Sequence, residues 1–216
     1  LAAGVVIQAD RSRERIDAFS EVMGRGWMVG PYVSAELAPS LFFTGRIAWG
    51  GSKNSAEIDV FEDGTRWSGD FDTDRFLARA SIYGQIEKGT MSILPQIDLA
   101  YMHEEQEDFT VTDGPNSVEV PGVTAELGRL SLSATVEWNI GRKEDGAIFY
   151  VKPQVDWDFK NTASATLDDR LRGSLEFGVR TAPKSNWQGA LSLRYDGIGG
   201  GDMEAVSVRG ALQMRM

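Results

Sequence analysis

The chain contains no cysteine, a single histidine and no long run of apolar residues among its 216 residues. The lack of cysteine excludes disulfide scaffolds and thiolate metal sites. No run reaches the length of about 18 apolar residues that a transmembrane helix needs. A net charge of −10 gives no general attraction to nucleic acid. The GxSxG, HExxH and phosphate-loop motifs are also missing, so no common catalytic signature points to an enzyme.

What the chain has in quantity is long alternation of apolar and polar residues. In residues 147–159, the odd positions are apolar and most even positions are polar. Successive side chains of a strand point to opposite faces, so this segment has one apolar and one polar face. Soluble strands have a typical length of about 5–6 residues, whereas a strand tilted across a bilayer needs about 9–11. The length of the alternation therefore predicts membrane-crossing strands.

Short turns and long polar stretches alternate between the patterned segments. Tight turns are expected at 38–40 and 87–89, and long external loops at 51–73 and 103–126. This rhythm predicts an all-β fold, an antiparallel up-and-down transmembrane β-barrel with its tight turns in the periplasm. Shorter turns at 141–146 and 182–186 and loops at 160–168 and 197–202 continue the scheme. The expected strands are 3–9 (in part), 26–37, 41–50, 75–86, 91–102, 128–140, 147–159, 170–181, 187–196 and 204–216.

Charged residues of both signs share the polar face. An Arg or Lys on the lipid face costs about 2–4 kcal/mol at the bilayer midplane, so these side chains are expected to line a wet interior of mixed charge. The alternative is a soluble β-sandwich whose polar face meets bulk water. The expected lumen-lining residues are Arg79, Asp98, Glu137, Lys152, Asp156, Arg172, Glu176, Arg194 and Arg209.

Aromatic and proline residues add two local expectations. Aromatic residues near the strand ends of the apolar face, among them Trp27 and Trp49, are typical of the lipid headgroup level. Pro31, Pro95 and Pro153 fall within expected strands, where proline removes a donor from the backbone ladder. Bulges or breaks in pairing are therefore expected beside these prolines.

Four stretches together resemble the autotransporter β-domains, the translocator barrels of type V secretion. They are Gly24–Val33 (GRGWMVGPYV), Leu41–Gly50 (LFFTGRIAWG), Leu94–Tyr101 (LPQIDLAY) and Leu127–Leu130 (LGRL). Each motif is weakly specific alone, but their order and spacing cover most of the chain. The resemblance implies a barrel in the outer membrane of a Gram-negative bacterium that exports or displays an N-terminal passenger.

The family barrel has twelve strands, and about ten are visible here. Residues 1–216 are accordingly expected to form one barrel domain that lacks the first hairpin and the upstream passenger. The expected partners are outer-membrane lipid, lipopolysaccharide, the barrel assembly machinery and the passenger, with no cofactor. The resemblance also makes the last strand an assembly signal, although this chain ends in Met where family members commonly end in Phe or Trp. Its expected residues are Val208, Leu212, Met214 and Met216.

A second class of function is a barrel that acts alone, as a pore or as an omptin-like surface protease. The candidate for proteolysis is His103, which is followed by the acidic segment 104–108. A solvated loop is the more economical interpretation of that segment. The acidic segment 57–74 matches no calcium loop and is interpreted in the same way. The sequence therefore predicts no catalytic residue and no metal site.

Overall fold

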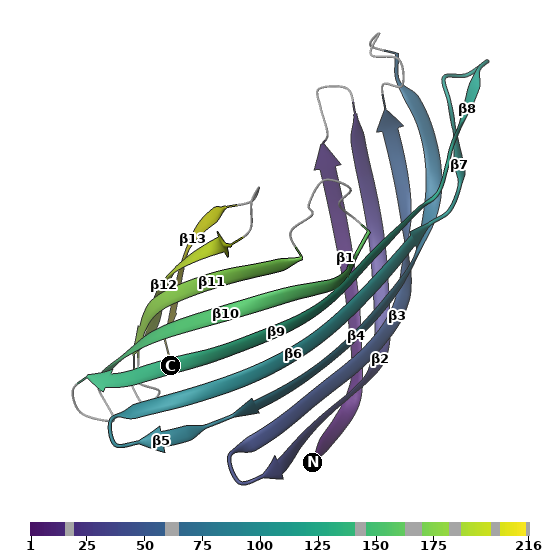
Figure 1. Cartoon of the computed structure of the whole chain (residues 1–216). Coiled ribbons are helices and arrows are strands. Elements are labelled where there is room, and N and C mark those ends of the chain that lie inside the picture. The colour runs from purple at the N-terminus through teal and green to yellow at the C-terminus, as the bar shows by residue number, and fades with distance from the viewer. Residues whose placement is uncertain are drawn as a thin grey trace.

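The structure, a computed structural model, consists of β-strands joined into one antiparallel sheet (Figure 1). The residues it describes are 1–15, 20–58, 65–140, 146–162, 170–181, 187–199 and 204–214. In this part of the chain, no helical segment has the length and apolar character to cross a membrane. The strands are β1 (Ala2–Arg15), β2 (Glu21–Ala38), β3 (Leu41–Ile58), β4 (Trp67–Gly84), β5 (Ile86–Lys88), β6 (Met91–Gln106), β7 (Phe109–Thr112), β8 (Ser117–Val120), β9 (Val123–Ile140), β10 (Ala147–Asn161), β11 (Leu171–Thr181), β12 (Trp187–Ile198) and β13 (Ala205–Met214).

Ten of these strands follow each other across the sheet in chain order, β1-β2-β3-β4-β6-β9-β10-β11-β12-β13. The short β5 continues β4 along β6, and β7 and β8 form a hairpin in the connection between β6 and β9. The expected up-and-down order of about ten strands is therefore confirmed. The tight turns at 38–40 and 87–89 are confirmed as well, with left-handed backbone at Ser40 (φ 61°) and Gly89 (φ 65°).

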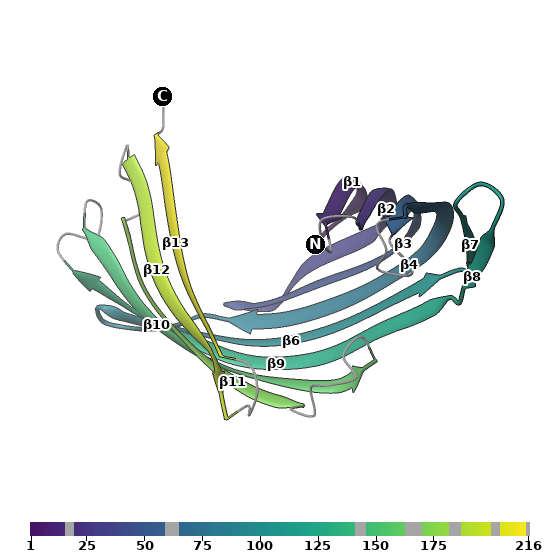
Figure 2. The ribbon, with the colours of Figure 1, turned by 90° about the horizontal axis from the view of Figure 1, so that it is seen from above.

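The sheet curves into an open trough, and its two edge strands are β1 and β13 (Figure 2). Among the described residues, β1 pairs only with β2 and β13 only with β12, so both strands have a free edge. The described strands therefore do not close into a barrel. An unpaired edge is costly in lipid because its backbone groups find no water there.

The strands of the first half are longer than the alternation predicts. β1 extends to Arg15, β3 continues to Ile58 and β4 begins at Trp67, with unbroken β3–β4 register from Ile58↔Trp67 to Leu41↔Gly84. The expectation of a loop over 51–73 is therefore wrong for 51–58 and 67–73. The expectation of a loop over 103–126 is likewise wrong for 103–106 in β6, for 109–112 and 117–120 in β7 and β8, and for 123–126 in β9. The ladder continues because backbone pairing needs no apolar face, whereas alternation ends where both faces meet water. The turns at 141–146 and 182–186 and the loops at 160–168 and 197–202 lie mostly outside the described residues.

The lengthened strands and the β7–β8 hairpin form a projection that rises above the rest of the sheet (Figure 1). It contains a small apolar core in which Val111 and Trp67 are almost fully buried. The rings of Phe71 and Phe109 lie 4.6 Å apart, and Ser68 pairs with Thr112. This packing explains how strands remain ordered beyond the membrane-facing belt.

The three prolines interrupt the ladder as expected. Pairs are missing beside Pro31 on its β3 side and beside Pro153 on its β9 side, while the register on either side of each gap is unchanged. Pro95 lies opposite the break between β4 and β5. The prolines therefore produce local breaks without shifting the strands, which keeps every face assignment intact.

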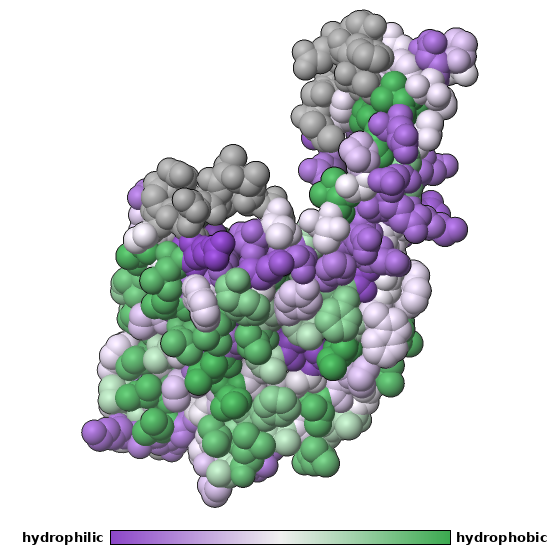
Figure 3. All heavy atoms as spheres, turned by 45° about the vertical axis from the view of Figure 1, so that its right-hand side comes forward, coloured by the Kyte–Doolittle hydropathy of each residue, from purple (hydrophilic) through white to green (hydrophobic). Residues whose placement is uncertain are grey.

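The apolar side chains form a belt on the outer surface of the sheet. Figure 3 shows this belt below a hydrophilic band and the hydrophilic projection. Trp27 and Trp49 are about half exposed at its upper end, and Leu37 is exposed at its lower end. Ten residues separate Trp27 from Leu37, or about 33 Å along the strand at ~3.3 Å per residue. Tilted by ~40°, that length spans about 25 Å, the usual height of an outer-membrane apolar band.

Gly30 on β2 and Gly50 on β3 allow these two strands to approach very closely. An added Cβ at Gly30 would overlap the backbone carbonyl of Ile47, and one at Gly50 would overlap that of Trp27. We expect Gly30→Ala to destabilise the sheet by about 1–3 kcal/mol, since overpacking forces the backbone to shift. Urea unfolding in detergent micelles measures the change. Gly210→Ala is the matched control, because nothing lies within 4 Å of a Cβ added there. Equal losses in the two variants would contradict a steric role for Gly30.

Candidate functional site: the polar inner wall

The strand register places all nine expected lumen residues on one face of the sheet. One row crosses four strands as Asp98↔Ser131, Ser131↔Asp156 and Asp156↔Arg172. A second row crosses five strands as Glu137↔Tyr150, Tyr150↔Gly178, Gly178↔Ser192 and Ser192↔Arg209. Because side chains opposite each other in a ladder share a face, the whole set lies on one surface. The second row ends at Arg209, opposite Ser192.

This polar face is the concave one. Side chains on it reach across intervening strands, since Arg180 on β11 bonds Glu137 on β9 at 2.8 Å, past β10. Side chains converge on a concave surface and diverge on a convex one. Exposure agrees with this geometry, because Asp98 and Asp156 on the polar face are buried while apolar residues such as Leu193 are about half exposed. We call this concave surface the polar inner wall.

Asp158 is the most enclosed charge of the polar inner wall. It is 1% exposed and lies between two guanidinium groups, with Arg129 Nε at 2.5 Å and Arg172 Nη2 at 2.8 Å. The three residues come from β9, β10 and β11, so this triad ties three strands together. The sequence pattern assigned Asp158 to the polar face but did not single it out. No sequence signal marks it, because its burial depends on the register of both neighbouring strands.

The other carboxylates of the wall are also engaged. Asp98 accepts hydrogen bonds from Arg79 Nε at 2.9 Å and from the Ser81 hydroxyl. Asp156 accepts from Ser131 Oγ at 2.5 Å and from Gln154 Nε2 at 2.8 Å. Neighbouring acids and bases thus neutralise one another locally, which leaves a polar surface of mixed charge.

Further along the wall, Tyr150 and Arg194 each bind one carboxylate. The Tyr150 hydroxyl donates to Glu176 at 2.7 Å, and its ring covers Gly178, where an added Cβ would overlap it. Arg194 bonds Asp196 at 2.8 Å. Arg209, on the edge strand β13, is exposed.

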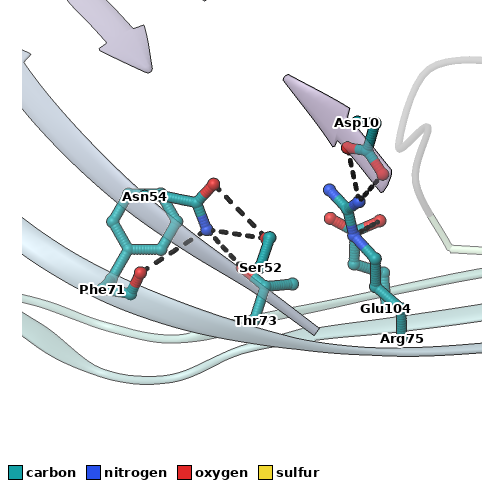
Figure 4. Close-up of polar contacts among 7 residues, drawn as sticks. All are labelled: Asp10, Ser52, Asn54, Phe71, Thr73, Arg75 and Glu104. Carbon is teal, nitrogen blue, oxygen red and sulfur yellow. Dashed lines mark hydrogen bonds and ion pairs between the residues drawn. The ribbon is translucent and has the colours of Figure 1, made fainter. Parts of the chain in front are cut away.

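At the upper end of the wall, Arg75 ties three strands together (Figure 4). Its guanidinium lies 3.1 Å from Asp10 on β1 and 3.5 Å from Glu104 on β6. Gly26 makes this crossing possible, because a Cβ there would meet Arg75 Nη1 at 2.6 Å. Beside it, Asn54 donates to Thr73 Oγ1 at 2.9 Å and to Ser52 Oγ at 3.0 Å. The inner wall therefore remains polar and internally bonded into the projection.

His103 does not belong to the polar inner wall. It lies on the outer face, with Nε2 3.7 Å from Glu105 and Nδ1 3.8 Å from Glu126. Glu126 is itself held by Lys160 at 2.9 Å and by the Tyr101 hydroxyl at 2.7 Å. These distances describe a surface cluster of charges. Across the described ranges, no group of three or more His, Cys, Asp or Glu residues is arranged to hold a metal ion.

The expected assembly residues lie on the outer face of the edge strand β13. Val208 is opposite Leu193, Leu212 is opposite Gly189, and both are largely exposed. Met214 lies on the same face at the end of the strand. Met216 falls outside the described residues. The structure thus presents an apolar edge strand, while its role as a signal remains an expectation.

An antiparallel sheet with a convex apolar face and a concave polar face is the wall of an outer-membrane type β-barrel. The family model for the autotransporter β-domain matches residues 1–201. The chain therefore belongs to the autotransporter β-domain family, and its place is the outer membrane of a Gram-negative bacterium. Its function is that of a translocator barrel for passenger export.

Solved structures agree on the fold. The translocator domain of the autotransporter NalP from Neisseria meningitidis is 14% identical, with a TM-score of 0.65 over 99% of this chain and 74% of that one. The β-domain of the Bordetella autotransporter BrkA is 19% identical, with a TM-score of 0.63 over 97% of this chain and 80% of that one. A comparison with curated protein sequences gives no match.

Proposed function

We propose that the polar inner wall lines the aqueous channel through which the N-terminal passenger of this protein crosses the outer membrane. The lumen-lining set is the one expected from the sequence, with Asp158 and Arg129 added. The observation that carries the proposal is the separation of faces within the height of the apolar belt, where charged residues such as Arg79, Asp98 and Asp156 lie on the concave surface and the convex surface is apolar. Charge on the lipid face would cost about 2–4 kcal/mol per Arg or Lys.

The chemistry of the wall suits a passage for an extended polypeptide of any sequence. Several of its acids and bases are bonded to one another, as in the Asp158 triad and the Asp98–Arg79 pair, and other carboxylates accept hydrogen bonds from neutral side chains. A wall that satisfies its own charges has no strong field of one sign, so it neither traps nor rejects a passing segment by charge. Water and side-chain hydroxyls can hydrogen-bond a backbone in transit, which an apolar lining could not do.

Closure and assembly need partners beyond the described strands. We propose that further strands pair with the free edges of β1 and β13, since lipid does not tolerate open edges. The barrel assembly machinery is proposed to recognise β13 through Val208, Leu212, Met214 and Met216. Outer-membrane lipid and lipopolysaccharide surround the apolar belt. No catalysis within this chain is proposed, because His103 stands outside the polar inner wall.

Export is tested by surface display of the full-length protein in a Gram-negative host. Deleting the residues after Gly210, or replacing Met216 by Asp, should block barrel insertion and passenger display together, because both depend on recognition of the last strand. Heat-modifiable gel migration measures insertion, and antibody labelling of intact cells measures display. His103→Ala is the matched control and should leave both unchanged. If His103→Ala instead abolished a surface hydrolase activity while insertion was normal, the omptin-like alternative would replace the translocator.

A further inference from the structure

Three cations stand in one row on the outer surface of the projection, just above the apolar belt. Arg11 on β1 is opposite Arg25 on β2, and Arg25 is opposite Lys53 on β3. All three side chains are exposed and lie on the convex face. None of them has an ion pair or side-chain hydrogen bond among the described residues. We call Arg11, Arg25 and Lys53 the outer cation row.

This row is electrostatically unfavourable by itself. Residues directly opposite each other on antiparallel strands have Cβ atoms about 4.5–5.5 Å apart, and like charges in such pairs repel. The chain as a whole carries a charge of −10, so a surplus of basic residues does not account for the row. An anion bound across the three strands would remove the repulsion.

Other cations of the same region are already neutralised. Arg13 makes a bidentate interaction with Glu21, with Nη2 at 3.0 Å from Oε2, and the hydrogen bond from Arg13 lowers the pKa of Glu21. On the inner face at this height, Arg75 has carboxylates on both sides (Figure 4). The outer cation row differs from these in having no acidic partner on its own strands. The nearest acid in register is Asp72, opposite Lys53 on β4.

The position of the row indicates a lipid headgroup. Trp27 lies two residues below Arg25 on the same face, or about 7 Å along the strand. Trp49 lies at the same end of the belt on β3. A groove on the outer surface is lined by Arg25, Lys53 and both tryptophans, with Asp72, Asp74 and His103 on its β4–β6 side. Tryptophan in this position marks the headgroup level of the bilayer. The outer cation row therefore faces the layer in which lipid phosphates lie.

A second feature of the same strands fits the other end of a lipid. The apolar belt below the tryptophans contains a hollow whose lining combines the small residues Ala3, Gly45, Ala78 and Ala80 with larger apolar ones such as Val33 and Leu99. It extends across β1, β3, β4 and β6 and is almost entirely apolar. The hollow begins at Pro31, six residues below Arg25, or about 20 Å along the strand. An extended acyl chain that runs down from a headgroup held at the row therefore reaches its upper part. A free phosphate ion could bind to the outer cation row but has no apolar part to occupy the hollow.

We propose that the outer cation row binds the phosphates of an anionic glycolipid of the outer leaflet, with one of its acyl chains in the hollow. The ligand class is a phosphorylated saccharide lipid of the lipopolysaccharide type. The proposal rests on the proposed translocator function and on the orientation expected from the sequence, with the tight turns in the periplasm and the projection outside the cell. It names a lipid site for the partner suggested there. Asp70, Asp72 and Asp74 on β4 face outward beside the row and confine an anion to β1–β3.

The test is binding of purified lipopolysaccharide to the full-length protein extracted from outer membranes in mild detergent, measured by native mass spectrometry. The triple variant R11Q/R25Q/K53Q should bind on the order of a hundredfold more weakly, since each surface Lys or Arg contributes about fivefold to binding of an anionic lipid. R13Q is the matched control and should bind within about twofold of wild type, because Glu21 already occupies Arg13. Lipid stripped of its phosphates should bind wild type as weakly as the triple variant binds intact lipid.

Further measurements separate the possible outcomes. Inorganic phosphate at millimolar concentration should not displace the lipid, and displacement would replace the lipid site by a free-phosphate site. Equal binding by wild type and the triple variant, or by intact and dephosphorylated lipid, would overturn the proposal. Heat-modifiable migration and passenger display are measured on the same variants, so failure of the translocator is seen separately. If the triple variant does not insert, R11Q alone, an exposed change on the edge strand β1, should still lose about fivefold.

Discussion

Replacing Asp158 by Asn should lower the free energy of unfolding by about 3–5 kcal/mol, because it removes one member of a buried ionic group and leaves the others uncompensated. Asp158 is enclosed between Arg129 and Arg172, and the three residues belong to three adjacent strands. Asparagine has the same shape but carries no charge, so the two guanidinium groups would face each other without a counterion. Urea unfolding of the protein in lipid vesicles, followed by tryptophan fluorescence, measures the loss.

The matched control is Glu57→Gln, which removes the exposed partner of Arg66. These two side chains lie 3.3 Å apart in the projection and are both largely exposed. Exposed pairs contribute about 0–1 kcal/mol, so this variant should unfold close to wild type. A loss for Asp158→Asn no larger than that of Glu57→Gln would mean that the triad is solvated and does not hold the wall together.

Leu193→Arg should destabilise the folded barrel by about 2–4 kcal/mol, because it places a charge on the lipid side of the sheet near its middle. Leu193 lies on the convex face between Phe177 and Val208, on the opposite side of the sheet from the carboxylates of the inner wall. An arginine there would have to displace lipid or stretch to the headgroups. The change is measured as the shift in urea midpoint after refolding into bilayers.

Ser192→Arg is the matched comparison, because Ser192 is the adjacent residue of β12 and belongs to the polar face opposite Gly178. The new charge would meet the wet interior. Water and the nearby Glu176 and Glu137 offset the repulsion from Arg209, which lies directly opposite, so the loss should be less than half of that for Leu193→Arg. Equal losses at the two positions would refute the assignment of faces on which the lumen rests.

The alternation of residues predicts the faces and the strand order, but not the height of the strands. Between 147 and 159 the pattern and β10 (Ala147–Asn161) agree closely, because one face of that segment meets lipid along its length. In β3, the pattern ends near Gly50 and the strand continues to Ile58. The length of the alternating segment therefore reflects the thickness of the apolar layer that the strand crosses, and not the full length of the strand. The ladder above it is held by backbone bonds and by polar side chains such as Asn54, which leave no periodic signal.

The partners of each inner-wall charge could not be predicted for a related reason. The alternation of odd and even residues assigns Asp158 to the inner face correctly. Which arginines lie beside it depends on the register of β10 with β9 and β11, which the sequence does not show. Parity also fails after a bulge. The register shifts between Asp158 and Lys160, so Lys160 turns to the outer face and bonds Glu126. A bulge of this kind has no sequence signature in the segment. It nevertheless moves every residue that follows it in the strand to the other face of the sheet.

With the tight turns in the periplasm, as expected from the sequence, the unequal strand lengths make the molecule lopsided toward the extracellular side. β2, β3, β4 and β9 have 18 residues each, whereas β11, β12 and β13 have 11, 12 and 10. On an intact cell, a protease or an antibody would therefore meet the ordered projection on one flank and strands that end near the membrane surface on the other. Variation that helps a bacterium to escape antibody recognition can accumulate on that raised flank without disturbing the bilayer-facing wall.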